Sequence, residues 1–177
     1  RPFGTMFQSP ILFEHLTVEK NLDFVIKRNQ LKTQNKTIIT KEYLINHLEL
    51  NSLLKRSPIN LSGGEKLRVV LARTILKQPE YLFLDEPMSD LDIKYKAKLL
   101  VFLKDINKKF KIPILYITHS IEEISQIGDQ IVLIKDGKKI DSGSVADIIN
   151  KSLFGDLTGK FELSSILEGM VVSHNQN

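Results

Sequence analysis

The sequence predicts an α/β fold built around a parallel sheet. Two short apolar runs, YLFLD at residues 81–85 and ILYIT at residues 114–118, alternate with stretches whose apolar residues recur at helical spacing. Strands that alternate with helices in this way are typical of folds in which helices cover a parallel sheet. Because both runs are short and apolar throughout, we expect the two strands to be buried on both faces.

Capping residues mark where the predicted helices begin. Thr17 and Thr40 precede two helical patterns within residues 16–60, which we interpret as a small helical subdomain. Ser62 and Glu65 form an S-x-x-E capping box at the start of the next helix. The remaining helix starts are predicted at Asp92, Ser120 and Ser144.

The two ends of this pattern have their own signals. Residues 1–15 read as the end of a strand followed by a loop, with Pro10 as the break. Near the other end, Asp136-Gly137 separates two runs within residues 130–143 and predicts a β-hairpin, after Gly128 has ended the preceding helix.

Composition excludes several classes of protein. The 25 Lys and Arg against 21 Asp and Glu give a net charge of +4, spread along the chain, which indicates a solvated surface and no nucleic-acid partner. The sequence has no cysteine, so it holds neither a disulfide nor a thiolate metal site. No apolar run approaches the ~20 residues that cross a bilayer.

Two glycines stand where a helix begins. In LSGGE at residues 61–65, Gly63 and Gly64 follow the predicted cap Ser62. Backbone N–H groups at a helix N-terminus are unpaired, and glycines let an anion approach them closely. The segment is therefore a candidate phosphate contact, and a plain turn with a helix cap is the alternative.

Two acids follow the first apolar strand. Asp85 and Glu86 would lie at the carboxyl edge of a parallel sheet, where open α/β folds bind ligands. Asp85 is placed to hold Mg²⁺, because hard cations prefer oxygen ligands, and Glu86 could polarise an attacking water. The alternative is a solvated loop after a core strand.

His119 follows the second apolar strand. We expect it to share an edge with Asp85 and Glu86, since carboxyl ends of parallel strands meet there. A structural role is the alternative for a lone histidine of this kind. The other histidines have no such context.

Taken together, the motifs resemble the ATP-binding subunit of ABC transporters over about residues 1–150. LSGGE resembles the family signature, YLFLDEP at 81–87 the Walker B strand with its catalytic glutamate, SDLD at 89–92 the D-loop, and ITHS at 117–120 the H-loop. MFQSPILFEHLTVEKNL at 6–22 resembles the Q-loop and the segment that meets the permease. The resemblance implies a P-loop NTPase-like ABC ATPase domain with a helical subdomain.

The resemblance also implies a role for each motif residue. Two subunits would pair head to tail around ATP, with Asp85 and Gln8 assisting Mg²⁺, Glu86 acting as general base, and His119 contacting the γ-phosphate. Asp92 would couple the two sites across the dimer. The segment that would close over the partner's ATP consists of Leu61, Ser62, Gly63, Gly64 and Glu65. Glu65 stands where glutamine is commoner in the family, and Asp90 replaces a small residue.

One family motif does not occur in the 177 residues. There is no G-x-x-x-x-G-K-[ST] sequence, and LTGKFE at 157–162 lacks the first glycine and the Ser/Thr after the lysine. In the family this loop precedes the Q-loop, so we interpret the sequence as an N-terminally truncated chain that is inactive by itself. Uncovered apolar surface where sheet strands are missing is a second expectation.

The resemblance extends to the kind of transporter. SSILEGMVVSH at 164–174 is similar to the join between ATPase and regulatory domain in molybdate importer subunits. We therefore expect a partial ATPase domain at 1–155 and, at 156–177, a linker into a further regulatory domain, with a disordered tail as the alternative. The implied partners are a second ATPase subunit, membrane permease subunits and, indirectly, an extracytoplasmic solute-binding protein, at the cytoplasmic face of the membrane. Three alternatives stay open, namely an importer for another anion, iron or polyamine, a soluble ABC-type ATPase acting on nucleic acid or ribosomes, and a degenerate, non-enzymatic subunit.

Overall fold

The chain divides into two compact units. The computed structural model describes residues 3–7, 11–29, 39–88 and 91–150 of the 177. The boundary between the units lies between Thr118 and His119. The first unit contains a sheet with its helices, and the second contains a hairpin with two short helices.

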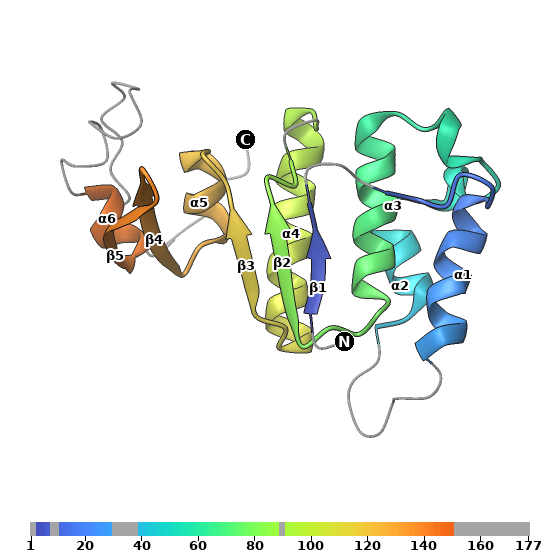
Figure 1. Ribbon diagram of the computed structural model, residues 1–177, viewed down its shortest axis with the longest axis horizontal. Coiled ribbons are helices and arrows are strands. Elements are labelled where there is room, and N and C mark those ends of the chain that lie inside the picture. Colours follow the sequence, from blue (N-terminus) through green and yellow to red (C-terminus); the bar gives the residue numbers. More distant parts are fainter. Residues whose placement is uncertain (1–2, 8–10, 30–38, 89–90, 151–177) are drawn as a thin grey trace, which may run out of the picture. The chain divides into compact units, whose positions relative to one another are not determined.

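The sheet of the first unit has three parallel strands. They are β1 (Phe3–Met6), β2 (Tyr81–Asp85) and β3 (Ile114–Ile117), with β2 in the middle. In the register of the two later strands, Asp85 lies opposite Ile117. Figure 1 shows the three strands side by side. The prediction of an α/β fold with a parallel sheet is confirmed.

In the chain, the described helices of the first unit lie between its strands, with α4 between β2 and β3 and the others between β1 and β2. α3 packs against both β1 and α1, and Figure 1 shows it between them. The elements are α1 (Val18–Asn29), α2 (Lys41–His47), the 3-10 turns η1 (Asn51–Leu53) and η2 (Pro58–Asn60), α3 (Gly63–Ile75) and α4 (Ile93–Phe110).

The predicted caps are confirmed because capping depends on residues close together in the chain. The hydroxyl of Thr40 accepts from the backbone N–H of Tyr43 at 3.1 Å, and that of Thr17 from the N–H of Lys20 at 3.3 Å. Ser62 and Glu65 form both bonds of the capping box. The helix that Thr40 caps, α2, ends at His47 and is shorter than the helical pattern in the sequence, and the 3-10 turn η1 follows it.

Burial of the strands differs from the prediction. In β2, Leu82 and Leu84 are buried, but Tyr81 is 47% exposed, and in β3 Leu115 and Ile117 are 55% and 52% exposed. The expectation of burial on both faces was wrong, because only one face of this sheet is covered by the described residues. The uncovered face carries aromatic contacts instead, with the ring centroids of Phe3 and Tyr81 5.7 Å apart.

The second unit is a hairpin packed on short helices. Its elements are α5 (Ile121–Ile127), β4 (Gln130–Lys135), β5 (Lys138–Ser144) and α6 (Val145–Asn150), and the two strands are antiparallel. Asp136 and Gly137 have φ of 51° and 71°, as a two-residue type I′ turn requires, so the predicted hairpin is confirmed. Its core is formed by Ile131, Val145, Ile148 and Ile149.

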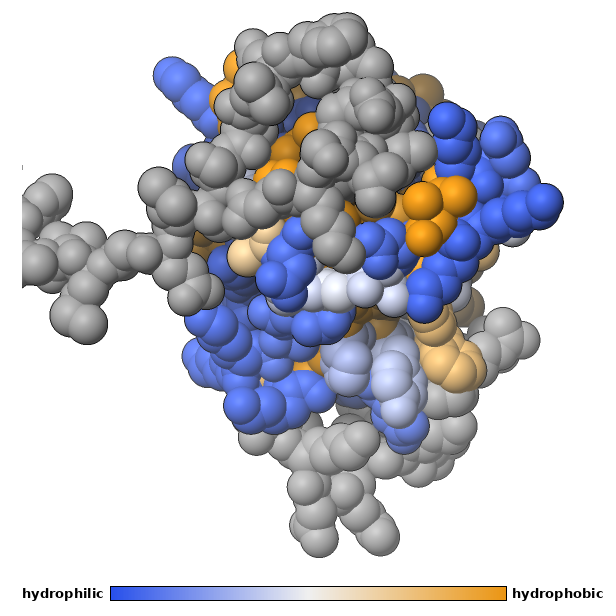
Figure 2. Space-filling model, turned by 90° about the vertical axis from the view of Figure 1, so that its left-hand side faces the viewer, coloured by the Kyte–Doolittle hydropathy of each residue, from blue (hydrophilic) through white to orange (hydrophobic). Residues whose placement is uncertain are grey.

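Apolar side chains are also exposed on the hairpin. Val132, Ile134 and Ile140 are 59%, 70% and 46% exposed. The face shown in Figure 2 likewise carries hydrophobic groups between hydrophilic ones. Among the described residues, no helix combines the length and the apolar character needed to cross a bilayer.

Candidate functional site

The turn before α3 presents backbone donors to solvent. The hydroxyl of Ser62 accepts from the N–H of Glu65 at 3.2 Å, and a carboxylate oxygen of Glu65 accepts from the N–H of Ser62 at 2.7 Å. These two bonds occupy the donors of the cap and of the third helical residue. The N–H groups of Gly63 and Gly64 open the helix and have no intrahelical acceptor. Because Ser62 and Gly63 are exposed, an anion can approach these donors from outside.

The charge of Glu65 is held in place by its neighbours. The backbone N–H of Ser62 lowers the pKa of Glu65 most, and Arg56 lowers it further. The guanidinium of Arg56 lies 3.0 Å from Glu65 Oε1 and also donates to the carbonyl oxygen of Asn60 at 2.5 Å. Leu61 is buried and anchors the other side of the turn. Glu65 therefore fixes the shape of the turn.

The two acids follow the central strand of the sheet. β2 ends at Asp85, and Glu86 has φ of 44°, in the left-handed region that side chains rarely adopt. The N–H of Glu86 donates to the carbonyl oxygen of Ile117 in β3 at 3.0 Å, which holds this backbone in place. Backbone strain of this kind concentrates at functional sites, where the surrounding structure enforces it. Both acids are half-buried, and Met88, two residues after Glu86 in the chain, is fully buried.

Asp92 caps α4. Its Oδ1 accepts from the backbone N–H of Tyr95 at 3.0 Å, and the residue is exposed. One carboxylate oxygen is therefore engaged in capping the helix. The predicted role of Asp92 between two subunits stays a prediction beside this local one.

His119 is the first residue of the second unit. β3 ends at Ile117, and His119 follows two residues later, exposed and just before the N-cap Ser120 of α5. The predicted meeting of His119 with Asp85 and Glu86 joins residues of two units, so it stays a prediction.

Gln8 lies outside the described residues, and so does Asp90 of the D-loop segment. Their predicted roles stay predictions.

Two polar residues of the first unit, Asn21 and Arg73, were not singled out in the sequence analysis. Asn21 of α1 is fully buried, and Arg73 of α3 is half-buried with its guanidinium reaching a carbonyl oxygen of the loop before α1. Each interrupts an otherwise apolar helical stripe, which is the only signal the sequence offers for them.

The acids at the end of β2 suit a metal ion that a phosphate group also holds. Among the described residues, no three His, Asp or Glu side chains gather as a metal site. Mg²⁺ is commonly bound by one or two carboxylates together with substrate phosphates and waters. The single carboxylate of Asp85 fits that arrangement, whereas it does not fit an ion held by protein ligands alone.

Comparison with known proteins defines the class. The family model described as ABC transporter matches residues 1–89, just over half of the 177 residues. The chain belongs to this family of ATP-binding cassette proteins. The fold agrees, because the chain is similar to the dimeric cassette MJ0796 in a post-hydrolysis state bound to ADP and Pi, with 25% identity, a TM-score of 0.68, and coverage of 81% of this chain and 62% of that one.

Curated relatives narrow the similarity further. The chain is 38% identical to the molybdenum import ATP-binding protein ModC of Haemophilus influenzae and 39% identical to that of Pasteurella multocida, in each case over 99% of this chain and 48% of the relative. The chain therefore spans about half the length of the curated relatives it matches.

Proposed function

We propose that the protein to which this chain belongs is the ATP-hydrolysing subunit that energises an ABC importer. One observation carries the proposal. An exposed, capped glycine turn begins α3, and at the end of the central strand of a parallel sheet Asp85 is followed by Glu86, whose φ is positive, in a chain of the ABC transporter family. Both features are suited to phosphate chemistry at strand ends and helix N-termini.

Within this proposal the chemistry is hydrolysis of the γ-phosphate of ATP. Glu86 accepts the proton of the attacking water as the bond between the γ-phosphorus and the ADP oxygen breaks. His119 contacts the γ-phosphate, and Gln8 orients the water. Positioning and electrostatics supply most of the catalysis in such a reaction, so the fixed backbone at Glu86 supports this role.

Mg²⁺ would neutralise charge on the phosphates. Asp85 would hold it, directly or through a water, together with Gln8 and the phosphate oxygens. This chain's contribution is the placement of one carboxylate at the end of β2.

The exposed glycine turn suits a nucleotide held by a second subunit. The glycine turn would close over the γ-phosphate of the partner's ATP, which would be contacted by Ser62 and by the N–H groups of Gly63 and Gly64. Leu61 and Glu65 would fix the shape of the turn. Asp92 would couple the two sites. Further partners would be membrane permease subunits and, through them, an extracytoplasmic solute-binding protein, so the ATPase would work at the cytoplasmic face of the membrane.

The cargo we propose is molybdate. This proposal rests on the similarity to relatives that are molybdenum import ATP-binding proteins, at 35–39% identity. We also propose that residues 1–155 form part of the ATPase domain, with a helical subdomain at about 16–60, and that residues 156–177 link to a regulatory domain.

The test of the ATPase uses the full-length protein with Glu86→Gln. Removing the base while keeping its size should lower ATP turnover at least about 100-fold and trap an ATP-bound dimer, measured by phosphate release and light scattering. Glu42→Gln, at an exposed glutamate of α2, is the matched control and should turn over ATP normally. Unchanged turnover in Glu86→Gln would remove the role assigned to this residue.

Cargo is tested in vesicles that contain the full-length protein with its permease and binding protein. ATP hydrolysis inside should rise when molybdate is added outside, with sulfate and Fe³⁺ as comparison. Stimulation by one of these instead of molybdate would reassign the cargo. Copurification with nucleic acid and without permease would contradict the importer.

A further inference from the structure

The loop before α1 is held by one buried side chain. The Oδ1 of Asn21 accepts from the backbone N–H of Phe13 at 2.9 Å. Its Nδ2 lies within hydrogen-bond distance of three carbonyl oxygens, those of Phe13 at 3.0 Å, Thr17 at 3.0 Å and Leu16 at 3.3 Å. Because Asn21 is fully buried, the polar atoms of its side chain are satisfied by these bonds inside the protein. The segment Ile11–Leu16 is therefore fixed to the first turns of α1.

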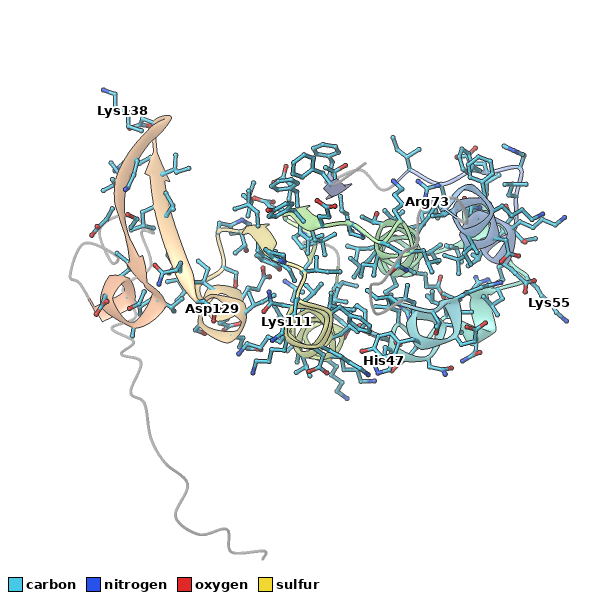
Figure 3. All side chains as sticks on the ribbon, turned by 90° about the horizontal axis from the view of Figure 1, so that it is seen from below. His47, Lys55, Arg73, Lys111, Asp129 and Lys138 are labelled. Carbon is cyan, nitrogen blue, oxygen red and sulfur yellow. The ribbon has the colours of Figure 1, made fainter. Side chains whose placement is uncertain are left out.

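Arg73 ties the same segment to α3. Its Nη2 donates to the carbonyl oxygen of Ile11 at 2.5 Å, its Nη1 to Oδ1 of Asn21 at 3.4 Å, and its guanidinium lies 5.1 Å from the ring centroid of Phe13. Figure 3 shows Arg73 reaching from α3 towards α1. Burial lowers the pKa of Arg73, but an arginine stays charged at neutral pH.

The partners of this cation decide what it does. Within the part of the chain that is described, they are a carbonyl oxygen, an amide oxygen and an aromatic ring, all of them uncharged. Desolvating a cation against neutral partners costs free energy that an apolar residue on this face of α3 would not cost. What the arginine supplies instead is a geometric link, since its planar fork binds the loop and Asn21 together.

A second set of bonds ties the loop region to the other end of α3. The N–H groups of Val18 and Glu19 donate to the carbonyl oxygens of Arg56 at 3.0 Å and Leu54 at 2.9 Å. Arg56 in turn pairs with Glu65 of the glycine turn at 3.0 Å. The chain around the loop is thus connected to α3 near both of its ends.

We propose that Arg73 and Asn21 are positioning residues that make the segment Ile11–Leu16 and the glycine turn Leu61–Glu65 move as one body. About ten residues of α3 separate Gly63 from Arg73, a length of roughly 15 Å at 1.5 Å per residue. A packed helix transmits displacement along that length. This inference rests on the proposed function only in that the moving turn closes on a nucleotide.

The loop also offers a surface on which force can act. Ile11 is 75% exposed, and the rings of Phe13 and Phe24 are partly exposed and meet edge to face, with centroids 4.9 Å apart. A protein bound to these side chains would press on a segment that Arg73 connects to α3. Without that connection the loop could shift while the glycine turn stays in place.

The first test needs no nucleotide. Hydrogen exchange is measured on the full-length protein with Arg73→Met, which removes the charge and the donors while keeping an unbranched side chain. Loss of charge-assisted bonds should speed exchange of the Phe13 and Leu16 amides about tenfold or more, with the amides in the middle of α3 unchanged. Arg73→Lys, which keeps the charge and loses the fork, should give a smaller increase and serves if Arg73→Met does not fold. Unchanged loop exchange would overturn the proposal.

The second test measures coupling in vesicles with the permease. The ratio of permease-stimulated to basal ATP hydrolysis should fall at least about fivefold in Arg73→Met, with basal hydrolysis within about twofold of the unsubstituted protein. Lys55→Met, which removes an exposed cation of the same subdomain (labelled in Figure 3), should keep the ratio. A retained ratio in Arg73→Met would overturn the proposal even if the loop loosens. Absence of ATP hydrolysis in the unsubstituted protein would instead contradict the proposed function, and the exchange measurement would then decide the inference alone.

Discussion

The carboxylate and the backbone of Glu49 both link neighbouring helices. Its Oε2 accepts from the hydroxyl of Tyr95 at 2.8 Å and its Oε1 from the ammonium of Lys98 at 2.7 Å, so the segment just after α2 is joined to the first two turns of α4. Arg68 of α3 donates to the carbonyl oxygens of Leu48 and Glu49 at 2.8 and 3.2 Å. The bond from Lys98, followed by that from Tyr95, lowers the pKa of Glu49.

This lowered pKa predicts how stability depends on pH. A carboxylate whose pKa is lower in the folded state contributes stability above its unfolded pKa, here 4.5, and loses it as pH falls through the lower folded value. Glu49→Gln should therefore reduce the free energy of unfolding by up to about 1 kcal/mol at pH 7, a small value because the group is solvated. The difference should begin to shrink as pH falls through 4.5 and should vanish only below the lower pKa of the folded state. Urea unfolding of the full-length protein at both pH values measures it.

A double-mutant cycle supplies the control for this prediction. Lys98→Met and Glu49→Gln should be non-additive at pH 7, because each removes the same ion pair, and additive in acid. Additive effects at both pH values would show that the pair contributes nothing.

The residue scale also shows what the sequence could not predict. Capping by Ser62 or Thr40 depends on residues three apart, so composition of one turn is enough to predict it. Asn21 and Arg73 are 52 residues apart in the chain, and the sequence around either residue does not predict their contact. The N–H of Glu86, whose φ is positive, donates to Ile117 of β3, which is likewise a contact between residues far apart in the chain.

At the scale of elements, periodicity predicted type and order but not burial. β2 and β3 form where the apolar runs predicted strands. A short apolar run that is bounded by loops and helix caps is too short for a typical helix, so a strand is the favoured structure. Whether the second face of a strand is covered depends on layers elsewhere in the fold. For this reason Tyr81 and Leu115 are exposed although their sequences indicated burial.

The packing of β1 on α3 leaves little room for a side chain at Gly4. A Cβ added there would lie 3.0 Å from Cγ2 of Thr74 and 3.1 Å from Cβ and Cγ of Pro79. Both neighbours are buried, and a helix residue and a proline ring yield little. Gly4→Ala should therefore lower the free energy of unfolding by about 1–3 kcal/mol, in spite of the chain entropy that alanine removes from the unfolded state. Urea unfolding of the full-length protein is the measurement.

Thr74→Ser removes the methyl group that the new Cβ would meet. In the double variant Gly4→Ala/Thr74→Ser, part of the loss should be recovered, so the combined effect should be smaller than the sum of the two single effects. If the two effects simply add, the contact between β1 and α3 is not what excludes a side chain at this position.

At the scale of the whole molecule, the candidate site has two parts that are suited to contact a phosphate. The glycine turn offers the N–H groups of Gly63 and Gly64, and the end of β2 offers Asp85 and Glu86. Carboxylates repel phosphate unless a cation lies between them, and two backbone donors on a surface bind anions weakly. The sequence pattern that supplies a phosphate cradle and its lysine, G-x-x-x-x-G-K-[ST], does not occur in the 177 residues.

We therefore expect the 177-residue chain alone not to bind ATP with Mg²⁺ measurably, whereas the full-length protein should bind it. Titration calorimetry of both proteins in one buffer tests this, with far-ultraviolet circular dichroism to show that the shorter chain retains its helices. ADP serves as the second ligand, because binding through the adenine alone would be equally strong for ATP and ADP. Saturable heat with a micromolar Kd for ATP in the shorter chain would mean that the glycine turn and the acids suffice to hold the phosphates. The proposal that a separate phosphate-binding loop is needed to hold the nucleotide would then be wrong.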